Sequence, residues 1–517
     1  MRPLQNLLIL LFLAVTSTPS VAQDGGADGN KYTDDTPIVS HHQIKARGKT
    51  LSYTARVGFL SLYSDSHELK GRMFYVSYTL DRAPNMAPRP LTFAWNGGPG
   101  SPAATLHLAF LGPRRAKLFD EYQGPPPPYQ LTDNDDTWLS FTDLVLVDPI
   151  GTGYSYPAKA EYLKDFWNVP GDIDSIGEFI RLYQSHFEIA DAPLFIAGES
   201  YGTVRAAGLA KILTDRRIPL SGVILISMGN LIRATANNDD LAPALILPSY
   251  TATAFVHKKL PPELQTDLEV TLKQAEAWAQ SDYIVALIKG DRLSPAERDA
   301  VVQQLARFTG LDASYVAKSN LRIPVDQFAR QLLKSQGLEV GHYGSNLTFK
   351  VPSENAPYDL WADPSLVSNG TSALIVPYLR SELGFNSDAR YAGPWGGGWP
   401  SPKTPRADWT AFRFDFGPAG FNFTVAQDLA DAMRRVPTMR VFVAHGYFDL
   451  VTPYFGAEYA LSHMGLDPAA RRNVVVKKYF GGHSMYVEKV TLSQMSNDIG
   501  EFIRTTTPAK RPTPSVQ

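Results

Sequence analysis

One serine in this sequence stands in a setting suited to nucleophilic chemistry. Ser200 is the central residue of Gly198-Glu199-Ser200-Tyr201-Gly202, which follows the apolar run Leu194–Ala197 and precedes a helical stretch. A serine on a tight turn from strand to helix projects its hydroxyl above a sheet, and small flanking glycines let neighbouring backbone approach closely. The N-terminus of the helix adds positive potential where an oxyanion forms. The sequence therefore predicts Ser200 as the nucleophile of a hydrolase of the α/β-hydrolase type.

A serine hydroxyl needs a general base, because it is a poor nucleophile at its ordinary pKa. In hydrolases with a G-x-S-x-G turn, an acid and then a histidine follow the serine along the chain. Asp449 comes shortly after the apolar run Val441–Ala444, which places a carboxylate at the C-terminal end of a strand. His483 lies in the glycine-rich segment Phe480–Ser484, which allows a loop to present its ring. We expect His483 to act as the base and Asp449 to hold its tautomer.

Two other histidines compete with His483 for this role. His463 is the only other histidine after Asp449, and it falls in the predicted helix Phe455–Met464, where a surface or packing position is expected. His445 is another rival, but it precedes Asp449 and so departs from the usual chain order.

An acyl-transfer site also requires donors for the oxyanion. The first expected donor is the backbone N–H after the nucleophile, that of Tyr201. The second is expected from a glycine-rich loop after an earlier strand, and Asn96-Gly97-Gly98-Pro99-Gly100 follows a strand that ends at Trp95. Gly98 is the predicted second donor.

The elements that position these residues follow an α/β pattern. Short and almost fully apolar runs are typical of strands buried on both faces of a parallel sheet. They occur at Leu91–Trp95, Leu144–Val147, Leu194–Ala197, Val223–Ile226 and Val441–Ala444. Helical stretches such as Ile173–His186 and Val204–Leu213 lie between them, and this alternation predicts a mainly parallel sheet. Before it, Tyr53–Tyr63 and Met73–Leu80 alternate apolar and polar residues and predict an antiparallel hairpin.

The alternation breaks after about residue 230, where helical signals replace strands. Ser294-Pro295-Ala296-Glu297 predicts a capped helix start, and Val325–Ser335 has helical spacing. We interpret this segment as an inserted helical cap. The predicted organisation is a signal peptide 1–22, a flexible arm 23–40, a first core part 41–230, the cap 231–385, a second core part 386–505 and a disordered tail 506–517.

Composition narrows the class of protein. Lys and Arg total 49 and Asp and Glu total 51, so no strong field attracts nucleic acid or an acidic membrane. The absence of cysteine from the sequence excludes disulfides, Cys-zinc sites and thiol catalysis. No tight cluster of metal-ligating residues or phosphate loop is apparent, so no metal and no cofactor are expected. The sequence sets no oligomeric state.

The N-terminus resembles an export signal. Arg2 precedes the apolar run Leu7–Val15, and Ser20-Val21-Ala22 offers small residues for cleavage. The run is too short for a permanent membrane anchor, and no later segment is long and apolar enough to be one. We expect export to the periplasm or the extracellular space, and a large exported chain without disulfides favours a bacterial envelope.

Several motifs together resemble the serine carboxypeptidases (peptidase family S10), as a bacterial-type member. They are Trp95–Gly100, Asp148–Tyr156, Gly198–Gly202, Asp449 and Gly482-His483. The resemblance implies removal of C-terminal residues from peptides through an acyl-enzyme. It also implies that Asn96, the N–H of Gly97 and a protonated Glu199 bind the free carboxylate of the substrate. Carboxyls in contact share a proton, which would favour peptidase activity at acidic pH.

The sequence departs from the family pattern at four points. Phe110 stands where the family has its second carboxylate-binding glutamate, and Ala94 stands where it usually has Trp. Ser484 stands where the family has a methionine after the histidine, and the family's disulfides are absent. Phe110 cannot donate a hydrogen bond, and His107 or a cap residue is a possible substitute. Two other functions therefore stay open: an esterase or acyltransferase on the same scaffold, and a non-enzymatic exported binding protein, against which intact Ser200, Asp449 and His483 argue.

Overall fold

The computed structural model of this chain describes residues 35–83, 86–117, 128–229, 240–350, 353, 363–364, 366, 368–393 and 425–507. The predicted signal peptide 1–22 and the chain from residue 508 onward lie outside the described residues. The predicted arm 23–40 extends too far, because Ile38 already begins the first strand and pairs with Val57. The predicted tail begins one residue early, since the last helix ends at Thr506.

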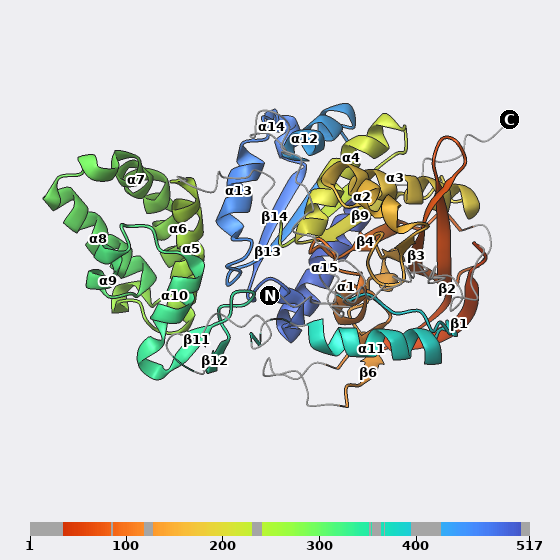
Figure 1. Cartoon of the computed structure of the whole chain (residues 1–517), viewed down its shortest axis with the longest axis horizontal. Helices are drawn as coiled ribbons and strands as arrows, with labels where there is room; N and C mark the ends of the chain where they lie inside the picture. The colour runs from red at the N-terminus through yellow and green to blue at the C-terminus, as the bar shows by residue number, and fades with distance from the viewer. Residues whose placement is uncertain are drawn as a thin grey trace, which may run out of the picture.

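A ten-stranded sheet forms the centre of the protein (Figure 1). Its strand order is β1 (Ile38–Ala46), β2 (Lys49–Tyr63), β3 (Leu69–Leu80), β7 (Asp143–Val147), β4 (Leu91–Trp95), β9 (Leu194–Glu199), β10 (Gly222–Ile226), β13 (Arg440–Gly446) and β14 (Val474–Tyr479), with β8 (Tyr156–Pro157) paired to β3. The pairs from β1 to β7 are antiparallel, and those from β7 to β14 are parallel. The sequence predicted both the hairpin of β2 and β3 and the mainly parallel sheet correctly.

The parallel strands bring the predicted chemistry to one edge. All five apolar runs assigned to buried strands lie in β4, β7, β9, β10 and β13. In β4, β9 and β10 every residue is buried, as strands covered on both faces require. Since the C-terminal ends of parallel strands meet at the same edge, the loops after β4, β9, β13 and β14 are neighbours.

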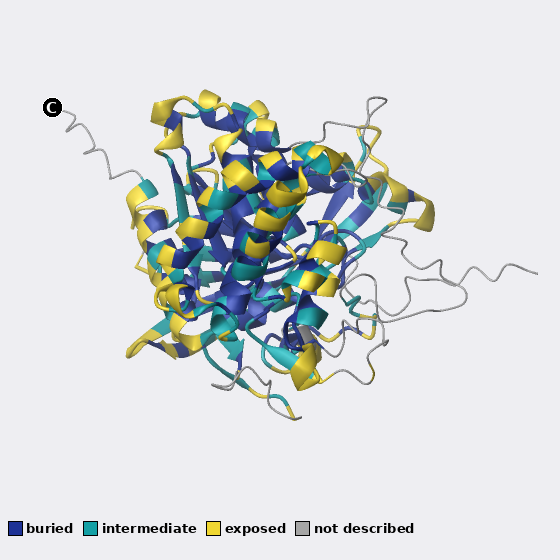
Figure 2. Ribbon diagram, turned by 90° about the vertical axis from the view of Figure 1, so that its left-hand side faces the viewer, coloured by how far each residue is buried: buried dark blue, intermediate teal, exposed yellow. Residues whose placement is uncertain are grey.

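Helices cover both faces of the sheet. One face packs against α3 (Val169–His186), α4 (Tyr201–Asp215) and α12 (Val425–Arg435). The other face packs against α1 (Ala104–Leu106), the adjoining π-helical turn η1 (His107–Leu111), the 3₁₀ turn η9 (Met485–Val487) and α15 (Lys489–Thr506). Figure 2 shows the buried residues along the sheet and on the helix sides that face it. This layering is the α/β-hydrolase arrangement that the sequence predicted.

The helices after β10 form a separate lobe with its own apolar cluster (Figure 1, left). They are α5 (Leu241–Val256), α6 (Leu268–Trp278), η5 (Ala279–Tyr283), α7 (Ile284–Lys289), α8 (Pro295–Thr309), α9 (Ala313–Lys318) and α10 (Val325–Leu332), followed by the hairpin of β11 (Leu338–Val340) and β12 (Thr348–Lys350). The predicted capping box of α8 is present, with Ser294 and Glu297 bonded reciprocally. The cluster continues into Phe448 and Tyr454 of the core, which joins the lobe to the sheet.

One helix within the predicted cap 231–385 belongs to the core instead. Helix α11 (Ser368–Ser381) places Ile375 and Tyr378 in the apolar cluster beneath the sheet. The Tyr378 hydroxyl lies 3.0 Å from that of Tyr78 on β3. The cap prediction was therefore too long at its C-terminal side, because helical spacing alone does not say which apolar surface a helix covers.

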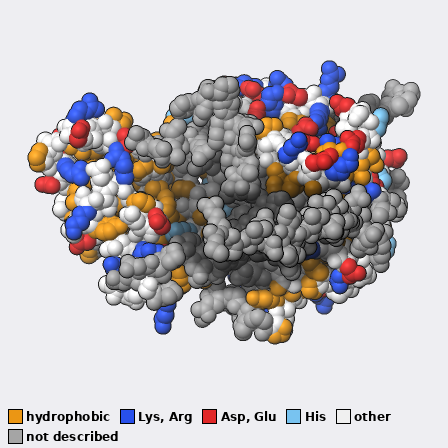
Figure 3. Space-filling model, viewed as in Figure 1, with side chains coloured by type: hydrophobic (Ala, Val, Ile, Leu, Met, Phe, Trp, Pro, Cys, Tyr) orange, Lys and Arg blue, Asp and Glu red, His pale blue; other side chains and the backbone are white. Residues whose placement is uncertain are grey.

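The surface agrees with the balanced composition. On the face in Figure 3, acidic and basic side chains are intermixed over both the lobe and the core. None of the helices in the described part of the chain has the length and apolar character needed to cross a bilayer.

Candidate active site

Ser200 occupies a strained turn between β9 and α4. Its backbone has φ 58° and ψ −128°, a region that a residue with a side chain enters only when its surroundings enforce it. Close packing supplies that constraint, because a Cβ on Gly198 would lie 2.0 Å from the carbonyl oxygen of Gly202. The Ser200 N–H donates to the Ile226 carbonyl at the end of β10 at 3.0 Å. Ser200 is half-buried whereas the residues on either side are buried, so the turn exposes this position most.

Asp449 and His483 form a buried hydrogen-bonded pair at the same edge. His483 Nδ1 lies 2.7 Å from Asp449 Oδ2, and the two residues are 5% and 0% exposed. Asp449 Oδ1 accepts from the N–H groups of Val451 and Thr452 at 2.8 and 2.9 Å. The Thr452 hydroxyl donates to Oδ2 at 2.5 Å. Donors surround both oxygens, which suits an ionised carboxylate, and such a carboxylate keeps the proton on Nδ1 and leaves Nε2 as the acceptor.

The electrostatic surroundings make His483 a stronger base. Burial lowers the pKa of its imidazole, but the charge and hydrogen bond of Asp449 and the charge of Glu199 together raise it by more. The net pKa lies above the ordinary value of 6.5. His483 is therefore protonated, and unable to accept a proton, over a wider range of acidic pH than an exposed histidine.

The end of β10 connects the serine turn to the histidine loop. Ile226 accepts from the Ser200 N–H, and the next residue, Ser227, donates its hydroxyl to the His483 carbonyl at 2.5 Å. Within the described residues the Ser200 hydroxyl makes no hydrogen bond to the His483 ring. Such bonds are often long in free enzymes and tighten only with substrate. The structure thus places all three residues at one edge and joins Asp449 to His483 directly.

The two rival histidines make no comparable contact. His445 is 0% exposed within β13, and neither of its ring nitrogens has a hydrogen-bond partner among the described residues. Burial lowers its pKa to about 4. His463 is exposed at the end of α13 (Tyr454–Ser462) and stacks on Tyr459, with ring centroids 3.9 Å apart.

The loop after β4 lies directly against the serine turn. A Cβ on Gly97 would lie 2.5 Å from the Tyr201 nitrogen and 2.9 Å from that of Gly202, so only glycine permits this approach. Gly98 has φ +104°, which also favours glycine. Both predicted oxyanion donors, Gly98 and Tyr201, therefore lie where loop and turn meet.

The Glu199 carboxylate lies beside this junction and accepts hydrogen bonds on both oxygens. Oε2 accepts from the Asn96 side-chain amide, whose own oxygen accepts from the Leu106 N–H at 3.0 Å. Oε1 accepts from the hydroxyls of Tyr486 at 2.7 Å and Ser484 at 3.1 Å. The structure thus brings together Asn96 and Glu199, as predicted, and adds two hydroxyl groups from the histidine loop.

Burial raises the pKa of Glu199 above its ordinary value, although the charge of His483 and the two hydroxyl hydrogen bonds act in the opposite direction. The carboxyl therefore takes up a proton more readily than an exposed glutamate. A Glu199 carrying that proton can donate a hydrogen bond to another carboxylate, whereas the anion repels it.

Phe110 is the residue on which the resemblance to the family places a second carboxyl group. It is 0% exposed and stacks on the Tyr486 ring with centroids 4.9 Å apart and an interplanar angle of 8°. His107 does not compensate, because its Nε2 lies 2.7 Å from the Tyr78 hydroxyl. Burial lowers the pKa of His107 to about 3. A hydrogen bond to Glu199 comes from the Tyr486 hydroxyl. Tyr486 could not be predicted as a site residue, because its position in the sequence matches no motif.

A buried ion pair behind the site also escaped the sequence analysis. Arg205 on α4 is 0% exposed, and its Nε donates to Asp172 Oδ2 of α3 at 2.7 Å. Its Nη1 donates to the Asn96 carbonyl at 2.6 Å. This pair therefore links two helices to the loop that carries Asn96. The sequence does contain a signal for this ion pair, because Arg205 lies on an otherwise apolar face of helix α4.

Replacing Arg205 by methionine is expected to reduce the free energy of unfolding by about 3 kcal/mol, because Asp172 loses the charge that compensates its burial. Chemical denaturation followed by circular dichroism measures this loss. The matched control is Arg181→Met, which removes an arginine that is half exposed and paired with Glu178 on one helix. Equal effects of the two substitutions would contradict the structural role of Arg205.

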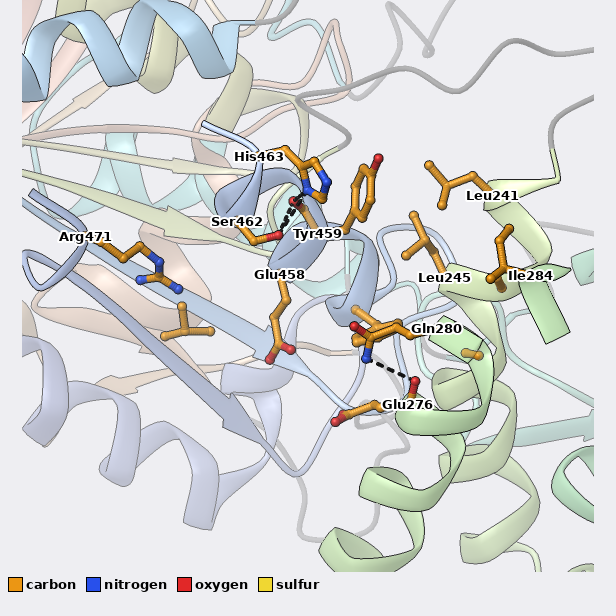
Figure 4. A pocket seen from close by; sticks show the side chains of 14 residues that line it. Leu241, Leu245, Glu276, Gln280, Ile284, Glu458, Tyr459, Ser462, His463 and Arg471 are labelled. Atoms are coloured by element: carbon orange, nitrogen blue, oxygen red, sulfur yellow. Dashed lines mark hydrogen bonds between the residues drawn. The ribbon is translucent and has the colours of Figure 1, made fainter. Parts of the chain in front are cut away.

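A cavity of about 590 Å³ lies between the helical lobe and α13 (Figure 4). Leu241, Leu245 and Ile284 of the lobe face it on one side, and Glu458 and Tyr459 of α13 on the other. None of the predicted site residues lines it.

An ion-pair network beside this cavity joins lobe and core. Lys478 on β14 lies 3.3 Å from Glu276 on α6 and 3.3 Å from Glu458 on α13. The cavity thus borders the junction of the two parts rather than the site. Across the described residues, no group of three or more His, Asp and Glu side chains is placed to hold a metal ion.

Comparisons with known proteins agree with the geometry. The family model for serine carboxypeptidase (peptidase S10) matches residues 48–258, a range that includes the Asn96 loop and the serine turn. The pheromone-processing carboxypeptidase kex1 of Aspergillus niger is 30% identical over 188 residues, which are 36% of this chain and 28% of that protein. The serine carboxypeptidase-like 5 protein of Arabidopsis thaliana is 29% identical over 154 residues, 29% of this chain and 33% of that protein. The matched segments thus span only about a third or less of these relatives.

A solved structure extends the likeness in fold beyond the matched sequence. The prohormone-processing carboxypeptidase Kex1 of Saccharomyces cerevisiae superposes with a TM-score of 0.51 at 15% identity, covering 87% of this chain and 91% of that one. At this low sequence identity, the superposition shows only that the two folds are similar. The α/β-hydrolase fold and the resemblance to peptidase family S10 are confirmed.

Proposed function

Residues 48–258 of this chain match the family model for serine carboxypeptidase, and from that similarity we propose that the protein hydrolyses the C-terminal peptide bond of peptides through a serine acyl-enzyme. The observation that carries this proposal is the buried Asp449–His483 pair, joined at 2.7 Å at the sheet edge where the strained Ser200 turn lies. An activated serine and an oriented base at one edge are the parts that acyl transfer requires.

In the proposed reaction, Ser200 Oγ attacks the scissile carbonyl carbon while His483 Nε2 takes the hydroxyl proton. The N–H groups of Gly98 and Tyr201 donate to the oxyanion. As the C–N bond breaks, His483 gives its proton to the leaving amine, and the acyl group remains on Ser200. Water, deprotonated by His483, then hydrolyses this ester. Asp449 stays ionised and stabilises the imidazolium throughout.

Asn96, the N–H of Gly97 and Glu199 are the proposed site for the free carboxylate of the substrate. Glu199 must carry a proton to donate to that carboxylate, and its raised pKa favours this state over a wider range of acidic pH than in an exposed glutamate. His483 must be unprotonated in the same complex. Peptide cleavage therefore requires one proton, held by Glu199 rather than by His483.

The test compares two blocked dipeptides, one with a free C-terminal carboxylate and one amidated, from acidic to neutral pH. A strong preference for the free acid that rises towards low pH, and its loss in Ser200→Ala, would support a carboxypeptidase. Equal turnover of the two peptides would overturn the substrate assignment. A failure of the folded protein to react with a fluorophosphonate probe at Ser200 would overturn the reaction itself and favour a binding protein.

An esterase or acyltransferase is the second candidate, and Phe110 is the observation that favours it. Phe110 stacks on Tyr486 at the residue where the resemblance implies a carboxyl group, and a phenyl ring cannot donate a hydrogen bond to a free carboxylate. Hydrolysis of simple esters without release of C-terminal amino acids would establish this function.

Ester hydrolysis is expected to lose activity on acidification from a higher pH than an ordinary histidine would give. It needs neutral His483 but no protonated Glu199, and the pKa of His483 is raised above 6.5. Since a base with a raised pKa is already protonated at that pH, kcat/KM for an ester should reach half its maximum above pH 6.5 and fall about tenfold per pH unit below it. A midpoint well below pH 6.5 would contradict the placement of Asp449 and Glu199 around His483.

Export through residues 1–22, to the periplasm or the extracellular space, is part of the same proposal, although that segment lies outside the described residues. N-terminal sequencing of the protein from an exporting host tests it. A mature chain that begins near Gln23 is expected, and an intact Met1 would contradict it.

A further inference from the structure

The hydroxyl of Tyr486 reaches Glu199 from a fully buried position. Tyr486 is 0% exposed, and its hydroxyl donates to Glu199 Oε1 at 2.7 Å while lying 3.3 Å from Ser484 Oγ. The stack on Phe110 fixes its ring from behind. Because Tyr486 lies two residues after Ser484 on the loop that carries His483, one short segment supplies the base and both hydroxyls.

Within the described part of the chain, two charged side chains act on Glu199. His483 and Asp449, from the loops after β14 and β13, act on it with opposite signs. On η1, behind Phe110, His107 is uncharged at neutral pH, because burial lowers its pKa to about 3. On α4, Arg205 is paired with Asp172. None of these replaces a second carboxyl group.

We propose that Tyr486 is a positioning residue of the carboxylate-binding site and that, with Ser484, it takes the place of a second carboxyl group as the hydrogen-bond partner of Glu199. This inference rests on the proposed function for its consequence in catalysis. The contact itself does not depend on that function.

A hydroxyl partner in place of a carboxyl partner changes the pH at which Glu199 loses its proton. A neighbouring carboxylate would repel the Glu199 anion and so retain a shared proton. A hydroxyl donates to the anion and stabilises it. Glu199 therefore releases its proton at a lower pH than it would beside a second carboxyl, and cleavage of free-acid peptides ends at a lower pH.

Tyr486→Phe tests this step, because it removes the hydroxyl and keeps the stack on Phe110. Without the hydrogen bond from the Tyr486 hydroxyl, the Glu199 anion is less stable, so Glu199 keeps its proton to a higher pH. The falling limb of kcat/KM for a free-acid peptide should move up by about half to one pH unit, which raises activity above that limb about three- to tenfold. Ser484→Ala should shift the limb in the same direction by less, because its bond is longer.

The matched control is Tyr479→Phe, since Tyr479 is also buried and its hydroxyl donates to a carboxylate, Asp498, at 2.8 Å outside the site. It should leave the limb unmoved. A second measurement does not need catalysis: the infrared band of the protonated Glu199 carboxyl, identified by its loss in Glu199→Gln, should persist to higher pH in Tyr486→Phe.

The results distinguish a failure of the proposed function from a failure of the role proposed for Tyr486. If the wild type cleaves neither peptide nor ester, the proposed function fails, and the infrared titration still decides whether Tyr486 holds Glu199. If folded Tyr486→Phe titrates like the wild type in both measurements, Tyr486 serves packing only and the inference is wrong.

Discussion

Asp449→Asn is expected to lower kcat/KM for peptides and esters alike by about 10³- to 10⁴-fold while the protein stays folded. The asparagine oxygen can still accept from the N–H groups of Val451 and Thr452, which bond Oδ1. Its amide nitrogen then faces His483 Nδ1, where Oδ2 now accepts at 2.7 Å. A donor at that place favours the tautomer with the proton on Nε2, and such an imidazole cannot take the proton of Ser200.

The measurement pairs steady-state kinetics on an ester substrate with thermal unfolding. Asp498→Asn is the control, because Asp498 also accepts from a buried hydroxyl, that of Tyr479, but lies on α15. It should retain activity within about twofold, because this half-buried carboxylate is not one of the predicted site residues. A loss below tenfold in folded Asp449→Asn would mean that another group orients His483, and the triad assignment would then fail.

The sequence sufficed for the central fold because its signals there are local. Runs such as Val223–Ile226 and Val441–Ala444 are apolar throughout, and only burial on both faces explains them. The Gly198–Gly202 turn could also be predicted from the sequence, because its glycines are required locally: a Cβ at Gly198 would have no room. These features depend on the residues themselves and their immediate neighbours, which a single sequence displays.

Contacts between distant segments were not predictable in the same way. Tyr486 meets Glu199 across 287 positions of the chain, and Arg205 meets the Asn96 carbonyl across 109. Neither partner constrains the type of the other strongly enough to leave a pattern. Helix α11 shows the same limit, because its apolar positions do not say whether they cover the lobe or the core. The departure from the family pattern at Phe110 is visible in the sequence, but the tyrosine that stacks on Phe110 is not.

Glu199→Gln should separate the two pH requirements of peptide cleavage. The glutamine oxygen can accept from Asn96, and its amide can donate to the hydroxyl oxygens of Ser484 and Tyr486, which also act as acceptors. The side chain is neutral at every pH, so it does not repel a substrate carboxylate when the pH rises. Cleavage of a free-acid peptide should then lose its falling limb. Two pH units above the wild-type limb, Glu199→Gln should be about 100-fold more active than the wild type.

The same substitution should move the acidic limb of ester hydrolysis in the opposite direction. The charge of Glu199 contributes to the raised pKa of His483, so its removal lowers that pKa and extends ester hydrolysis to lower pH. The matched control is Glu488→Gln, at the N-cap of α15, where the carboxylate accepts from Asn346; this substitution should shift neither limb. If Glu199→Gln instead lowers peptide cleavage equally at all pH values and leaves the ester limb in place, Glu199 binds substrate in one protonation state only. The carboxylate of the substrate would then be held mainly by Asn96 and the Gly97 N–H, and the hydroxyls around Glu199 would matter for packing rather than for titration.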